Sequence, residues 1–150
     1  FPDWAGFGRD GKPNFWLARR EPYHTGVHVA ISCDRRATVG AFYDAAIAEF
    51  KLLQVDPPRA VFALTMIGEC VEAKGEMGEA VGKYKEALNQ PQITLSESLE
   101  LYYLLGSVFE RLGDVREALY FFENLRKRDA TFRDVGRRIA ALKPANARQA

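Results

Sequence analysis

The hydrophobic pattern of the chain changes near residue 35. Before this point short apolar runs are separated by Gly, Pro and Asp, which is typical of strands and turns. These runs are Trp4 to Phe7, Phe15 to Ala18 and Val27 to Ile31. Beyond residue 35 apolar positions recur at steps of three and four, and this period predicts helices almost to the end of the chain.

The first part predicts a small antiparallel sheet. Asp10 and Gly11 lie between two aromatic runs, and Asp-Gly favours a tight hairpin turn because glycine tolerates a positive φ. After a break from Pro22 to Gly26, apolar and other residues alternate over 27–31. We therefore expect three short strands in this part of the chain.

The second part predicts six helices, at about 35–55, 58–74, 77–89, 96–112, 115–128 and 132–142. Several residues mark their ends in ways that suit helix termini. Gly75 and Gly113 suit C-caps, Thr94 with Glu97 and Asp114 with Glu117 have capping-box spacing, and Pro144 is expected to close the last helix.

Two of the predicted helical hairpins repeat each other at a constant offset of 38 residues, counted from Gly68 to Gly106. Leu64, Ile67, Gly68, Val71, Gly75, Ala80, Tyr84 and Ala87 correspond to Tyr102, Leu105, Gly106, Phe109, Gly113, Ala118, Phe122 and Leu125. We expect the small residues to let two antiparallel helices approach closely. Tyr84 and Phe122 should fill the space towards the next repeat.

These spacings resemble the tetratricopeptide repeat over about 44–142. Its signature is a large residue, Leu-Gly and an aromatic residue in one helix, then Ala and Phe four apart in the next. The offset of 38 places the extra residues at Asn89 to Thr94, and Ala46, Phe50 and Leu53 resemble an upstream half-repeat. The resemblance implies stacked helical hairpins with a last, capping helix. An unrelated array of amphipathic hairpins is the alternative.

Residues 1–49 resemble a different family, the vicinal oxygen chelate group of glyoxalases, bleomycin-resistance proteins and extradiol dioxygenases. The segments Gly6 to Leu17, Gly26 to Ile31 and Ala37 to Tyr43 carry this resemblance. It implies that His28 corresponds to a metal-binding histidine of the family. We expect the partner ligands to have been lost by truncation, so His28 is a remnant without activity, because a catalytic metal needs three or more protein ligands.

The two resemblances overlap at residues 43–50. Unrelated folds rarely share a helix, so we expect a recombined or engineered chimera. The expected fold class is α+β, with a small N-terminal antiparallel β-sheet joined through the shared helix to tetratricopeptide-like stacked helical hairpins. The expected domains are a vicinal oxygen chelate-like fragment at 1–49 and helical repeats with a capping helix at 44–150.

Composition narrows the choice of partners and of compartment. Lys and Arg number 21 against 20 Asp and Glu, a net charge of +1, so no overall field draws the chain to nucleic acid or to a membrane. Cys33 and Cys70 form no CxxC pair. We see neither a signal peptide nor a long apolar run, although the chain opens inside patterned sequence and we expect something to have been removed in front. Free thiols and a cytoplasmic protein follow.

The repeat spacing also predicts a groove that could bind a peptide or protein. Its expected lining is Glu69, Glu72, Tyr103, Ser107 and Glu110. This surface is acidic and should prefer a basic or aromatic segment, although a merely solvated helical face is the alternative. Lys and Arg crowd the last helices, and there we favour a solvated capping face over a nucleic-acid surface.

We therefore expect a non-enzymatic interaction scaffold with no catalytic residues and no cofactor. The alternative is a metal-dependent, glyoxalase-like or dioxygenase-like enzyme whose site is assembled between chains. The front strands should leave an edge unpaired, and this predicts a homodimer that would bring two copies of His28 into one assembly.

Overall fold

The computed structural model describes residues 4–9, 12–18 and 36–149, and side chains over 38–144. It divides the chain into two compact units, Phe1–Gly40 and Ala41–Ala150. In the first unit β1 (Trp4–Arg9) and β2 (Lys12–Ala18) pair antiparallel as a two-stranded ribbon, with a register shift between Phe7 and Gly8. The predicted third strand at 27–31, and His28 with it, lies outside the described residues.

Six helices follow among the described residues: α1 (Arg36–Leu53), α2 (Pro57–Ala73), α3 (Met77–Leu88), α4 (Leu95–Leu112), α5 (Val115–Arg128) and α6 (Val135–Gln149). Their order agrees with the sequence prediction. The predicted end of the last helix is wrong, because Pro144 lies inside α6. A proline ring holds φ near the helical value, and here the helix continues past it.

The predicted α+β class is wrong as well: the fold is helical. All core residues that the structure describes belong to helices, and the described strands form a ribbon of two, without a third strand to make a sheet. A two-stranded ribbon is marginal alone and cannot supply one layer of an α+β core. The helices, by contrast, bury their apolar stripes against one another.

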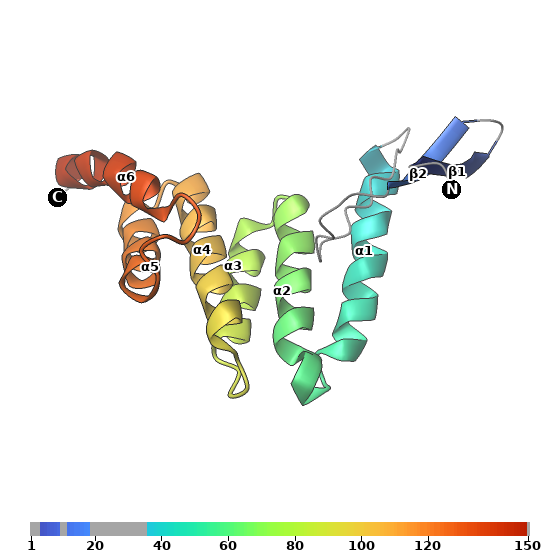
Figure 1. Cartoon of the computed structure of the whole chain (residues 1–150), viewed down its shortest axis with the longest axis horizontal. Helices are drawn as coiled ribbons and strands as arrows, with labels where there is room; N and C mark the ends of the chain where they lie inside the picture. Colours follow the sequence, from blue (N-terminus) through green and yellow to red (C-terminus); the bar gives the residue numbers. More distant parts are fainter. Residues whose placement is uncertain (1–3, 10–11, 19–35, 150) are drawn as a thin grey trace. The chain divides into compact units, whose positions relative to one another are not determined.

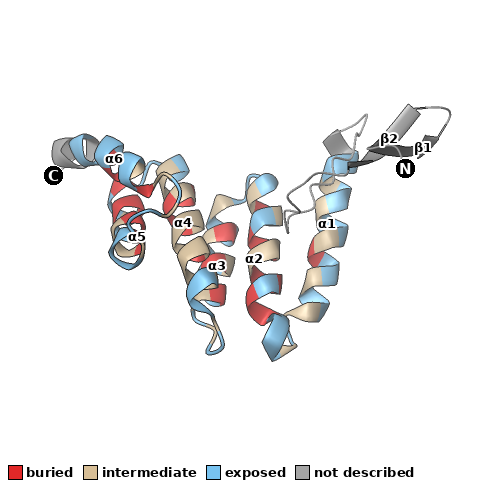
Figure 2. Ribbon diagram, in the orientation of Figure 1, coloured by how far each residue is buried: buried red, intermediate tan, exposed pale blue. Residues whose placement is uncertain are grey.

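Consecutive helices pack in chain order from α2 to α6, so that α2 with α3 and α4 with α5 form two hairpins (Figure 1). The helices from α2 to α6 each carry several buried residues, whereas Ile47 is the buried residue described on α1 (Figure 2). Thr94 makes the predicted capping box with Glu97, and Asp114 accepts a hydrogen bond from the Glu117 N–H. Gly113 adopts a φ of 77° at the end of α4, a conformation that favours glycine.

The repeated glycines allow the two helices of each hairpin to approach closely, as the sequence predicts. A Cβ built on Gly68 would lie 2.3 Å from Tyr84 Cε1, and one on Gly106 would lie 2.6 Å from Phe122 Cε1. The two rings therefore cover the glycine of their own hairpin. Tyr84 also shares a core cluster with Leu101 and Leu105 of α4, and Phe122 shares one with Ile139 of α6, which agrees with the predicted filling of the space towards the next repeat. Both rings are fully buried.

Candidate binding face on α2, α4 and α6

The five residues of the predicted groove lie on the first helices of the two hairpins. Glu69 and Glu72 belong to α2, and Tyr103, Ser107 and Glu110 belong to α4. We call this surface, together with the polar side chains of Arg111, Arg133, Asp134, Arg137 and Arg138 that meet it, the first-helix face. The sequence spacing predicts Glu72 and Glu110 on this face, but it does not predict their arginine partners.

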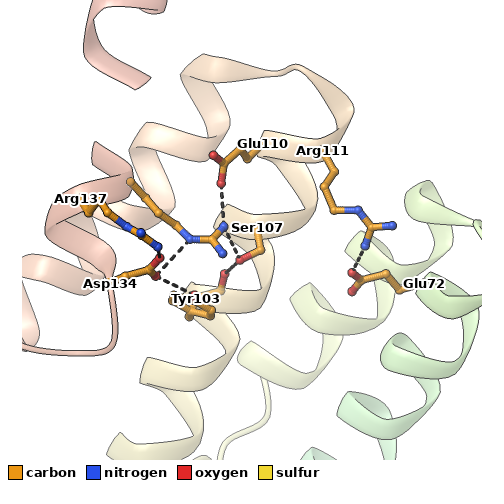
Figure 3. Close-up of polar contacts among 8 residues, drawn as sticks. Glu72, Tyr103, Ser107, Glu110, Arg111, Asp134 and Arg137 are labelled. Atoms are coloured by element: carbon orange, nitrogen blue, oxygen red, sulfur yellow. Dashed lines mark hydrogen bonds and ion pairs between the residues drawn. The ribbon is translucent and has the colours of Figure 1, made fainter. Parts of the chain in front are cut away.

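A polar network joins α4 to α6 across this face (Figure 3). Arg138 donates from Nη1 to Glu110 Oε2 at 2.7 Å and to Ser107 Oγ at 3.3 Å, and from Nε to Asp134 Oδ1 at 3.1 Å. The Tyr103 hydroxyl donates to Asp134 Oδ1 at 2.8 Å. The Arg138 guanidinium also lies 5.0 Å from the Tyr103 ring centroid. Arg138 therefore docks the capping helix on the second hairpin.

Ionisation of this network follows from its hydrogen bonds. Arg137 Nη2 donates to Asp134 Oδ2 at 2.6 Å. This bond, followed by the one from Tyr103, holds the pKa of Asp134 well below its usual value. Burial first, and then the hydrogen bond to Asp134, raises the pKa of Tyr103. Asp134 is thus a carboxylate acceptor and Tyr103 a phenol donor at neutral pH.

A second network joins α2 to α3 and α4. The Tyr84 hydroxyl donates to Glu72 Oε2 at 2.8 Å, and Arg111 forms an ion pair with the other oxygen, Oε1 (Figure 3). Burial and, after it, the hydrogen bond to Glu72 raise the pKa of the Tyr84 phenol. Glu72 is half-buried with both oxygens occupied, so it serves first as a structural acceptor.

Glu69 is the carboxylate of this face whose charged neighbours are mostly other carboxylates. It is exposed and makes no ion pair among the described residues. Partial burial of its carboxyl, then the carboxylates of Glu100 and Glu72, raise the pKa of Glu69, while Arg133 opposes them. A cation brought to this place would be favoured by all three carboxylates.

The face is therefore less acidic than the sequence predicts. Arginines neutralise most of its carboxylates: Arg111 pairs with Glu72, and Arg138 pairs with Glu110 and Asp134. Arg133 pairs with Glu100 and Arg137 with Asp134. Some of the basic residues near the C-terminus therefore neutralise carboxylates on or beside this face. Arg111 directly follows Glu110 in the sequence, but it points to α2 and pairs with Glu72.

A hollow of about 600 Å³ opens between α4 and α6. Six of its seven lining residues have polar or charged groups, among them Ser107, Glu110 and Arg138, and their carbon atoms form most of its wall. Such a lining offers both donors and acceptors to a polar chain. In the part of the chain that the structure describes, no cluster of three or more His, Cys, Asp or Glu side chains is arranged to hold a metal ion. Of the two cysteines Cys70 is described, half-buried with a free thiol.

No protein-family model matches the chain, and comparison with curated proteins finds no match. None of the helices over the described ranges is long and apolar enough to cross a membrane.

Proposed function

We propose that the helical unit is a non-enzymatic, tetratricopeptide-like scaffold that binds a segment of a partner protein on the first-helix face. One observation carries the proposal: polar side chains of α4 and of the region of α6 line the 600 Å³ hollow, and Glu72 of α2 joins the same face through its ion pair with Arg111, which is one of the lining residues. Stacked hairpins present such faces as extended binding surfaces.

The chemistry of the face supports a partner segment that carries a basic residue. Burial of its carboxyl, and then repulsion by the carboxylates of Glu100 and Glu72, raises the pKa of Glu69. A Lys or Arg of the partner would relieve this repulsion. Glu72 and Glu110 already have arginine partners, so Glu69 is the residue on which we expect a basic ligand to depend.

Titration with a labelled peptide of alternating Lys and Ala, followed by fluorescence anisotropy, tests the proposal. Glu69→Lys should weaken binding by about tenfold, on the order of one charge-pair contact. Glu79→Lys is the matched control, because Glu79 is equally exposed but lies in the first turn of α3. The control should bind as the unaltered chain does.

Equal affinities of the two variants would show that the peptide responds to net charge alone and would contradict the proposal. Absence of measurable binding to the unaltered chain would do the same. Binding should also weaken with added salt, since the Glu69 contact is close to solvent.

A further inference from the structure

Four aromatic rings form a continuous cluster beside α3. Phe109 and Phe121 stack with centroids 5.5 Å apart, Tyr102 lies 6.0 Å from Phe121, and Tyr120 meets Phe121 edge-on at 5.1 Å. Phe121 is buried, whereas Tyr120 is 57% exposed. The cluster thus extends from the core to solvent.

The repeat does not require these rings on α5. At the offset of 38, Tyr120 and Phe121 correspond to Gly82 and Lys83 of the first hairpin, so a hairpin of the same geometry forms without rings at these positions. Phe121 itself packs in the core cluster that it shares with α2, α3 and α4. Phe122 alone covers the glycine of its hairpin. Tyr120 in particular is an exposed aromatic residue that the packing of the helices leaves unexplained.

Three of the four rings line a hollow of about 360 Å³ between α3 and α5, which we call the α3–α5 hollow. Leu88 and Asn89 close it at the end of α3, and Tyr102, Tyr120 and Phe121 form its aromatic wall. Its volume lies at the small end of the range for ligand sites, roughly 300 to 1,000 Å³. Such a hollow suits one side chain better than a large ligand.

Two cationic side chains at this cluster contact aromatic rings and form no ion pair with a described carboxylate. Lys85 Nζ is 5.3 Å from the Phe109 centroid and 5.9 Å from that of Phe121, and the Arg128 guanidinium is 4.5 Å from the Tyr102 centroid. Over the described residues neither forms an ion pair, whereas Arg111 and Arg138 of the first-helix face both do. Glu117 is the one carboxylate that lines the hollow.

We propose that the α3–α5 hollow is a second docking surface, which takes a partner segment with an aromatic side chain flanked by acidic residues. The aromatic side chain enters between Leu88 and Tyr120, and aromatic anchors in small pockets are typical of binding hot spots. The flanking carboxylates meet Lys85 and Arg128, which form no ion pair among the described residues. Glu117 and Asn89 can accept backbone N–H groups of the segment.

A labelled peptide with Trp at its centre and Glu on both sides is the probe, and isothermal titration with the full chain is the measurement. Tyr120→Ala and Lys85→Glu should each weaken binding by about tenfold or more. Phe62→Ala is the matched control, because Phe62 is 53% exposed but lies on α2. This control, and Glu69→Lys on the first-helix face, should leave the affinity unchanged.

Replacing the central Trp of the probe by Ala should abolish binding. The proposal is overturned if both peptides bind alike, if Tyr120→Ala keeps the affinity, or if the Trp peptide does not bind at all. A single-stranded oligonucleotide provides a further arm. Tighter, salt-sensitive binding of the oligonucleotide that Lys85→Glu abolishes would assign the rings and cations to nucleic acid and would also overturn the proposal.

Discussion

The two hairpins pack their helices in the same way, but different polar groups stabilise them. In each, a helix glycine lies under a buried ring, Gly68 under Tyr84 and Gly106 under Phe122. The ring carries a hydroxyl in the first hairpin and none in the second. Tyr84 uses its hydroxyl to hold Glu72, while the equivalent carboxylate, Glu110, is held by Arg138 of the capping helix.

This difference shows which part of a repeat is fixed by packing and which part is free to vary. The ring needs a glycine opposite it in both hairpins, because a Cβ at that position would overlap the ring. The carboxylate needs a donor, but the donor can come from inside the hairpin or from the next helix. The first hairpin is thus held by a hydrogen bond of its own, and the second depends on α6.

The largest effect is expected from adding a methyl group at the shared glycine. Gly68→Ala would bring a Cβ to 2.3 Å from a ring that is fully buried and cannot move aside. We expect a loss of about 2 kcal/mol in the free energy of unfolding, since overpacking outweighs the better helix propensity of Ala. Urea unfolding followed by circular dichroism measures it. Gly106→Ala, at 2.6 Å, should behave alike.

Gly82→Ala is the control within the same hairpin. Gly82 lies inside α3, and nothing is within 4 Å of a Cβ built there. This change should stabilise the protein by up to about 1 kcal/mol. If Gly68→Ala proved as stable as Gly82→Ala, the close contact of helix and ring would not be the common element of the two hairpins.

The helices could be predicted from the sequence because their apolar spacing and caps are local signals. Thr94 with Glu97 and Gly113 mark the ends of α4 as expected. The fold class was missed because alternation over 27–31 says nothing about whether the strands gain enough partners for a layer of their own. The end of the last helix was predicted wrongly at Pro144, because a proline favours the end of a helix but does not require it.

The site could be predicted only in part. Spacing placed Glu69, Glu72, Tyr103, Ser107 and Glu110 on first helices, because positions relative to the glycine repeat. It could not supply Arg111 or Arg138 as partners of those carboxylates, since these pairs join residues 39 and 28 positions apart. The aromatic hollow between α3 and α5 was missed for the same reason.

A smaller effect is expected from removing the hydroxyl that distinguishes the hairpins. Tyr84→Phe keeps the buried ring over Gly68 but leaves Glu72 without its phenol donor. We expect a loss of about 1.5 kcal/mol in the free energy of unfolding, the low end of the range for a hydrogen bond to a charged group. The same urea experiment applies.

Glu72→Gln, alone and combined with Tyr84→Phe, completes a double-mutant cycle. The combined loss should be smaller than the sum of the two single losses, because both substitutions weaken the same contact between the Tyr84 hydroxyl and Glu72. Additive losses would mean that the hydroxyl and the carboxylate do not interact, and the contrast between the hairpins would then lie in Arg111 alone.

The smallest effect is expected at the link between the second hairpin and α6. Asp134 accepts from Arg137, Tyr103 and Arg138, and these bonds hold its pKa below the usual value. Because the pKa is lower in the folded chain, the stabilisation is full above the unfolded pKa of about 3.9 and is lost as the pH falls towards the folded pKa. Asp134→Asn should therefore destabilise the protein at pH 7 by less than about 1 kcal/mol, given how exposed the ion pairs are.

The pH dependence identifies the cause of that loss. The stability difference between the unaltered chain and Asp134→Asn should narrow as the pH is lowered from about 5 to about 2, because the carboxyl of the unfolded chain takes up a proton in this range while that of the folded chain resists protonation. Urea unfolding at several pH values measures the difference, and Asp44→Asn, which removes an ion pair with Lys74 on another part of the unit, reports on charge loss in general. A gap that stayed constant over this range would mean that Asp134 acts through its shape and not its charge. The second hairpin would then hold α6 by apolar packing of Val135, Ile139 and Leu142, and the two hairpins would differ less than their polar groups suggest.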